Sequence, residues 1–218
     1  MAPSRLIVLL ALAVVALAQD PALPLGQVEV HGRWRTGADL QPFWARLLPP
    51  DPAFGGNRTL QVVYQPPPPA TLGGTRLVDC PFLLLDQTGC LVAWNDRNGN
   101  SEARRQGTRY AVKRDRTPDD KADLQVVSAE VGPAPAWDRT VAPLLVALTW
   151  TPDSNRVIPV VDLYGDQPAA AVAWNRSEVL LGGLTCRAVA GPDGTLKSLV
   201  TDRNVDLLII DERKERAP

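Results

Sequence analysis

Residues 77–85 read LVDCPFLLL, residues 86–89 read DQTG, and residues 90–94 read CLVAW. An apolar run, a turn with Asp and Gly, and a second apolar run are typical of a β-hairpin. The 21 prolines and 16 glycines of the chain supply turns between many further short apolar runs. Strands are expected at 28–30, 60–64, 109–113, 124–131, 144–150, 157–163, 169–174, 185–189, 196–200 and 205–210. The pattern predicts an all-β fold of one or two small β-sandwich units.

The N-terminal part has a different character. Residues 19–57 are expected to be a short irregular segment, with one or two helical turns over Leu40–Leu48 that stop at Pro49 and Pro50.

An internal duplication is predicted by a repeated motif. Val92-Ala93-Trp94-Asn95 recurs 80 residues later as Val172-Ala173-Trp174-Asn175, and Asp86-Gln87 recurs at the same offset as Asp166-Gln167. Similarity at a fixed offset is the mark of a duplicated unit, although hairpins with the same turn, strand and Trp can also arise independently. The expected units are residues 58–136 and 137–218.

Residues 1–18 have the features of a cleavable signal peptide. Arg5 precedes 13 consecutive apolar residues, and the run ends in Ala16-Leu17-Ala18, a pattern that a signal peptidase accepts. A spanning helix needs about 20 apolar residues, and no second long run follows. We therefore expect a secreted, periplasmic or envelope protein without a membrane span in the mature chain.

The cysteines limit the possible disulfides, and the net charge limits the classes of partner. Export permits a disulfide between two of Cys80, Cys90 and Cys186, or all three stay thiols. A tight hairpin turn at 86–89 would hold Cys80 about 16 Å from Cys90, so the hairpin and a Cys80–Cys90 bridge exclude each other. A formal net charge of -1 gives no electrostatic reason to expect nucleic acid as a partner.

Few residues indicate catalysis or a cofactor. His31 is the single histidine, so multi-histidine metal sites are impossible and no catalytic residue is assigned. Asp96, Asn98, Asn100 and Glu102 place oxygen side chains at alternating positions, as Ca²⁺ prefers, although the sequence favours a polar hairpin turn at these residues. No other cofactor is expected.

Trp94 and Trp174, each followed by Asn95 or Asn175, are candidate binding residues because exposed indole rings can stack on sugars. The alternation of apolar residues around both tryptophans favours the other interpretation, in which the rings pack in the core. Exposure of either ring would support the sugar site.

Residues 79–112 resemble the pre-peptidase C-terminal domain, a small β-sandwich appended to secreted bacterial enzymes. The resemblance rests on the Asp79-led strand, the Asp86 and Gly89 turn, Val92-Ala93, Glu102 and the stretch from Gly107-Thr108 to Tyr110. It implies a β-sandwich with a surface-binding or export-related role.

The sequence therefore favours an exported, non-enzymatic protein that binds a partner protein, a polysaccharide or a component of the cell envelope. The alternatives are a secreted hydrolase that uses carboxylates, such as a glycosidase, and a structural component of the envelope.

Overall fold

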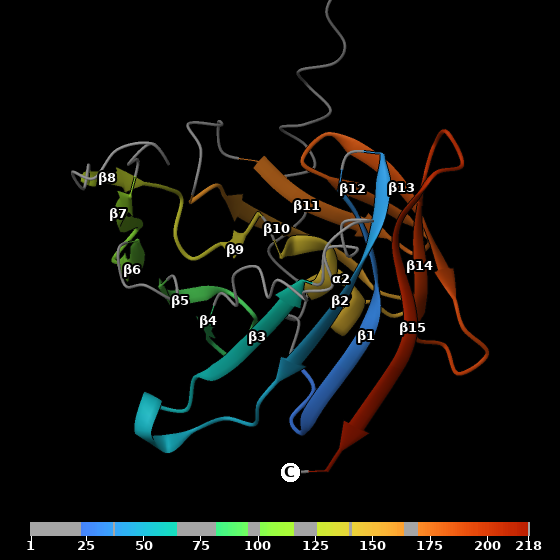
Figure 1. The fold of residues 1–218 in the computed structure, drawn as a ribbon, viewed down its shortest axis with the longest axis horizontal. Coiled ribbons are helices and arrows are strands. Elements are labelled where there is room, and N and C mark those ends of the chain that lie inside the picture. Colours follow the sequence, from blue (N-terminus) through green and yellow to red (C-terminus); the bar gives the residue numbers. More distant parts are fainter. Residues whose placement is uncertain are drawn as a thin grey trace, which may run out of the picture.

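The computed structural model describes residues 23–36, 38–64, 82–95, 101–115, 126–139, 141–163 and 170–217 (Figure 1). The strands are β1 (Gln27–Thr36), β2 (Asp39–Leu47), β3 (Arg58–Tyr64), β4 (Phe82–Leu85), β5 (Leu91–Asn95), β6 (Glu102–Gln106), β7 (Arg109–Asp115), β8 (Val126–Val131), β9 (Trp137–Asp138), β10 (Asn155–Val161), β11 (Ala170–Asn175), β12 (Glu178–Leu181), β13 (Leu184–Ala190), β14 (Leu196–Thr201) and β15 (Asp206–Arg216). The described helices are the 3-10 helix η2 (Pro52–Phe54) and the α-helix α2 (Ala142–Thr149). The all-β prediction is confirmed. Neither of these helices is long and apolar enough to cross a membrane.

All fifteen strands belong to one hydrogen-bonded sheet, in the order β8-β7-β6-β5-β4-β3-β2-β1-β15-β14-β13-β12-β11-β10-β9. Neighbours are antiparallel except β9, which runs parallel to β10. β1–β8 and β9–β15 are two runs of consecutive neighbours, and β1 pairs with β15 where the two runs meet. The strands of residues 58–136 and 137–218 therefore share one sheet, while their division into two sandwich units and their duplication stay predictions.

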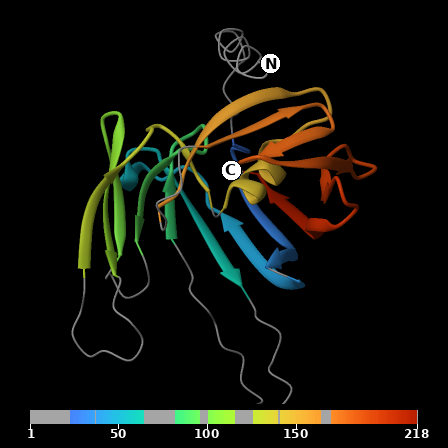
Figure 2. The ribbon, with the colours of Figure 1, turned by 90° about the horizontal axis from the view of Figure 1, so that it is seen from above.

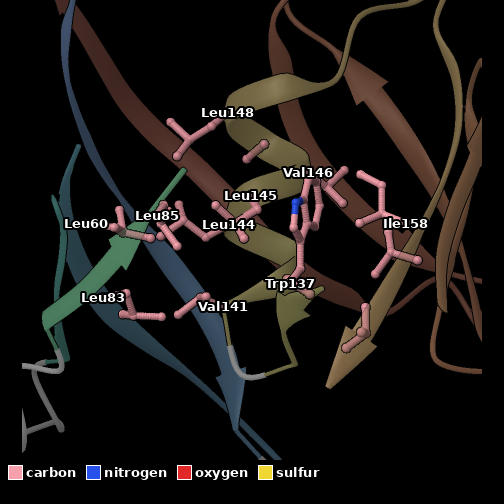
Figure 3. Packing of buried hydrophobic residues seen from close by; sticks show 14 of the residues in the cluster. Leu60, Leu83, Leu85, Trp137, Val141, Leu144, Leu145, Val146, Leu148 and Ile158 are labelled. Carbon is pink, nitrogen blue, oxygen red and sulfur yellow. The ribbon is translucent and has the colours of Figure 1, made fainter. Parts of the chain in front are cut away.

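The sheet curls around α2, as the view from above shows (Figure 2). Every residue of α2 except Pro143 is buried. In Figure 3, Leu144 and Leu145 face Leu60 and Leu85 on one side of the helix. On the other side Val146 and Trp137 face Ile158. Side chains of α2 thus pack against those of the surrounding strands in the core.

The expectation of a strand at 144–150 is wrong, because this segment forms most of α2. Its apolar residues run without a break from Leu144 to Leu148, so their spacing carries no period that separates a buried helix from a buried strand. Pro143 lies in the first turn, where a missing N–H costs no hydrogen bond and the fixed φ suits a helix.

The expectation of helical turns at 40–48 is also wrong, and the described part of the 19–57 segment is largely regular. β1 and β2 form a long antiparallel pair, and Phe43, Ala45 and Leu47 alternate as buried residues along β2. Pro42 is compatible with this strand because the pairing of β2 with β3 begins one residue later, at Phe43.

Tyr110 on β7 forms hydrogen bonds with the segment that connects β8 to β9. Its hydroxyl accepts a hydrogen bond from the Ala136 N–H at 2.9 Å and lies 3.1 Å from the carbonyl oxygens of both Leu91 and Ala136. The Leu91 N–H also donates to the Ala136 carbonyl, at 2.9 Å. These contacts join β7 and β5 to the connection between β8 and β9.

Arg58 fastens the N-terminal segment to β3. Its guanidinium is buried and donates to the carbonyl oxygens of Leu48 at 2.7 Å, Gly26 at 2.6 Å, and Pro24. Burial lowers the pKa of Arg58 to about 10, so the group remains a cation at neutral pH.

The predicted hairpin at 86–89 is present. Leu83 pairs with Trp94 and Leu85 with Leu91, and the Asp86 carboxylate accepts from the Thr88 N–H, the Thr88 hydroxyl and the Cys90 N–H. A tight hairpin of this kind is the geometry that excludes a Cys80–Cys90 bridge on the sequence argument. Cys80 itself lies outside the described residues. Cys90 and Cys186 are both buried and are not bonded to each other.

Candidate binding groove

The exposed side chains of β4 and β6 lie on the outer face of the sheet, opposite the core. On β4, Leu83 and Leu85 point into the core, whereas Phe82 is exposed and Leu84 half-buried. The same alternation buries Ala103 on β6 and leaves Arg104 exposed. The outer side chains of β3–β8 therefore form one continuous surface.

Two hollows occupy this surface and meet at β6, and together we call them the outer groove. The first, of about 340 Å³, is lined by Phe54, Thr59, Phe82, Leu83, Leu84, Ala93, Trp94, Asn95, Glu102 and Arg104. The second, of about 530 Å³, is lined by Glu102, Arg104, Gln106, Ala111, Val112, Lys113, Ser128, Ala129 and Glu130. Glu102 and Arg104 belong to both.

The first hollow is the aromatic end of the outer groove. Phe82 is 44% exposed and Phe54 is 51% exposed, although both are large apolar side chains. Because Thr59 pairs with Leu84 and Gln61 with Phe82, the outer face of β3 borders that of β4. The two phenylalanines thus provide an apolar surface within a site of small-ligand size.

Phe54 is held in place by the tight connection between β2 and β3. Asp51 caps η2 by accepting from the Ala53 N–H at 2.8 Å, and Gly55 closes the turn with a φ of 66°. The Asn57 side-chain amide donates to the Phe54 carbonyl at 2.7 Å. The exposed ring therefore stands on a loop whose backbone is fixed by hydrogen bonds.

The second hollow is the charged end of the outer groove. Glu102 stands opposite Lys113, which stands opposite Ser128. In the next row Arg104 stands opposite Ala111, which stands opposite Glu130. The first row thus has Glu102 beside Lys113, and the second has Arg104 and Glu130 on either side of Ala111, so this end can pair with charged or hydrogen-bonding groups.

The predicted binding residues are distributed over two places. Trp94 and Asn95 line the aromatic end of the groove, and Glu102, a predicted calcium ligand, lies at its centre. Trp174 and Asn175 lie on β11, nine positions away in the strand order. The other calcium candidates, Asp96, Asn98 and Asn100, fall outside the described residues. No three His, Cys, Asp or Glu residues of the described part gather as a metal site.

Both predicted tryptophans belong to the core. Trp94 is 5% exposed and Trp174 is 3% exposed. The Trp174 indole N–H donates to the Ser154 hydroxyl at 2.8 Å, and its ring lies 5.9 Å from that of Trp137. This confirms the core-packing interpretation, and a ring buried in this way offers no face to a sugar.

Sequence reasoning missed Phe54, Phe82 and Arg104. Phe82 was recognised only as part of an apolar run, and its outward orientation follows from the register of β4. Phe54 lies between Pro52 and two glycines, where an apolar aromatic residue has no core to enter. An aromatic residue in such a turn is the one local signal that could have indicated the groove.

Two acidic residues outside the groove lining pair with arginines. Asp86 also pairs with Arg105 at 2.7 Å, and Asp162 lies 3.7 Å from Arg139. Burial, together with the negative charge of Asp202, raises the pKa of the Cys186 thiol to about 11, so this cysteine is protonated and unreactive at neutral pH. His31 lies on β1, away from the groove-lining residues, with its ring 6.5 Å from that of Trp44.

No family model, curated protein or solved structure matches this chain.

Proposed function

We propose that the chain is an exported, non-enzymatic binding protein whose outer groove docks apolar side chains of a partner protein. The observation that supports this most strongly is the pair Phe54 and Phe82, which come from different elements and share one hollow while each is about half exposed. Exposed aromatic residues in a fixed pocket are typical anchors of protein interfaces. The resemblance of residues 79–112 to an appended surface-binding domain points in the same direction.

The charged end of the groove supports a protein as the partner. Arg104 lies beside the aromatic hollow, with Lys113 and Glu130 further along the same surface. An apolar centre next to charged groups of both signs is the usual layout of an interface, in which the polar groups fix orientation and exclude wrong partners.

A polysaccharide is less well supported as the ligand. Trp94, Trp137, Trp150 and Trp174 are all buried, and the remaining two, Trp34 and Trp44, are half-buried. A carboxylate-dependent hydrolase is also less well supported, because the Asp86 carboxylate is taken up by its turn and by Arg105.

The proposal includes export through residues 1–18, and an accompanying disulfide that would involve Cys80. N-terminal sequencing of the chain isolated from its source is expected to begin at residue 19. Mass spectrometry with and without reductant tests the disulfide. A mature chain that begins at Met1 would refute the export part.

The groove is tested with two matched double variants. Phe54→Ser with Phe82→Ser removes both aromatic anchors, whereas Leu180→Ser with Leu184→Ser removes two side chains of similar exposure, 39% and 40%, on the distant β12–β13 hairpin. Each form of the tagged chain is used to capture proteins from the extracytoplasmic fraction of the source. A protein retained by the wild type is then purified and titrated against all three forms.

We expect the groove variant to bind at least about tenfold more weakly, a loss of about 1.4 kcal/mol, and the β12–β13 variant to bind as the wild type does. Equal binding by all three forms would overturn the proposed site. A retained ligand that resists protease and is a glycan would overturn a protein as the partner.

A further inference from the structure

The edge strand β8 is unusually open to pairing with another strand. Among the described strands it pairs with β7 alone, and that ladder runs without a bulge from Tyr110–Val131 to Asp115–Val126. Its sequence, VVSAEV, contains one charge and neither Pro nor Gly. Natural edge strands are commonly protected by lysines, prolines, bulges or short length, and β8 has none of these.

The opposite edge of the same sheet is protected. β9 has two residues, and both Trp137 and Asp138 are buried. By contrast, Val127, Ser128 and Glu130 on β8 are exposed, with Val127 at 43%. In both Figure 1 and Figure 2, β8 stands at the outer end of the sheet, away from α2. The difference between the two edges indicates that β8 is where a strand can be added.

The side chains of β8 suit antiparallel pairing with a second β8. Residues on one face of such a pair meet across the two-fold axis in a fixed register. With the axis at Ala129, Val127 meets Val131 of the second copy on the inner face, and Ser128 meets Glu130 on the outer face. The two glutamates do not face each other. Each glutamate approaches a serine whose neighbour on β7 is Lys113, so the charges are complementary.

We infer that β8 pairs with the β8 strand of a second copy of this chain, antiparallel and centred on Ala129, and so forms a continuous sheet across a symmetric dimer. The inner-face pairing covers Val127, a large apolar side chain that the isolated chain leaves exposed. It also places the charged ends of the two outer grooves side by side, since Ser128, Ala129 and Glu130 line that end. The inference does not depend on what the aromatic end binds.

The test is the molar mass of the mature chain in solution. Sedimentation velocity and light scattering from about 1 to 100 µM are expected to show a concentration-dependent dimer. Val127→Lys places a charge on the inner face of the edge, and we expect it to raise the dimer dissociation constant at least tenfold. Val205→Lys is the matched control at a valine of similar exposure, 37%, in the β14–β15 turn, and it is expected to dimerise as the wild type does.

A second variant tests the register without disturbing the fold. Ala129→Cys places two thiols across the proposed axis, within disulfide reach of paired strands, so mild oxidation is expected to give a covalent dimer. Val205→Cys is expected to form no covalent dimer under the same conditions, because its thiol lies far from the proposed axis. A wild type that is monomeric at 100 µM overturns the inference and leaves the edge to a strand of a different protein. A dimer that survives Val127→Lys unchanged, in a variant with native circular dichroism, also overturns it.

Discussion

Replacing Tyr110 by Phe removes one oxygen atom from the contact that fastens β7 and β5 to the β8–β9 connection. The ring stays, and its packing changes little, so the variant isolates the hydroxyl. Tyr110 and Ala136 are both 0% exposed, which means that water cannot replace the lost partner without opening the structure.

The size of the effect follows from the atoms involved. The Ala136 N–H donates to the hydroxyl oxygen and would lose that acceptor, whereas the Ala136 carbonyl keeps its hydrogen bond from the Leu91 N–H. One buried donor without its partner costs about 1–3 kcal/mol. We expect the free energy of unfolding to fall by about 2 kcal/mol, which is a decrease of about 4–8 °C in Tm for a chain of this size.

Urea denaturation followed by tryptophan fluorescence measures the change, and an unaltered m-value shows that the same surface unfolds. Ser128→Ala deletes an exposed hydroxyl on the neighbouring strand and is expected to change the stability by less than about 0.5 kcal/mol. A Tyr110→Phe variant as stable as Ser128→Ala would refute the reasoning.

The same variant has a pH signature. Burial is the main cause that raises the pKa of Tyr110 to about 12. In the unfolded chain tyrosine ionises near pH 10, so the unfolded state loses its proton first and the wild type loses stability as pH rises from about 10 to 12. The difference in free energy of unfolding between the wild type and Tyr110→Phe should therefore decrease from pH 10 to 12 and stay constant below pH 10. A stability difference that increases over this pH range would contradict the raised pKa of Tyr110.

Three further outcomes are expected. Leu144→Ala, which empties a fully buried site in α2, should lower the free energy of unfolding in urea by about 2–5 kcal/mol, against less than about 0.5 kcal/mol for the exposed Leu180→Ala. Gly32→Ala should cost about 3 kcal/mol in the same assay, because an added Cβ would overlap the Ile209 carbonyl oxygen where β1 meets β15. Cys186, with a thiol pKa raised to about 11, should make the wild type lose stability as pH rises from 9 to 11, and denaturation of Cys186→Ala should lack that slope.

The hairpin at 86–89 could be predicted because its turn depends on residues that are close together in the sequence. Asp86 and Gly89 sit where the turn needs a capping carboxylate and a positive φ, which is 84° at Gly89. The alternation around Trp94 and Trp174 likewise predicted that both rings are buried. In each case the deciding interactions join residues that are near one another in the sequence.

The rest depends on long-range packing. A segment such as 144–150, apolar except for Thr149, takes its helical form from the curved sheet that surrounds it, and no local period reveals this. β6 was missed because four of its five residues are polar, and the strand is held by the single buried Ala103 and its neighbours. The groove was missed because Phe54 and Phe82 meet only after β3 and β4 have paired.

The position of β15 has a consequence for biosynthesis. Gln27 pairs with Arg216, so the ladder at the middle of the sheet joins the earliest described strand to the last one. While residues 206–216 are still missing from a growing chain, β1 and β14 each lack the neighbour that β15 provides. Contacts between residues so far apart in the sequence also form slowly. Completion of the sheet must therefore wait until residues 206–216 are available, and until then the edges of β1 and β14 are free to pair with other strands.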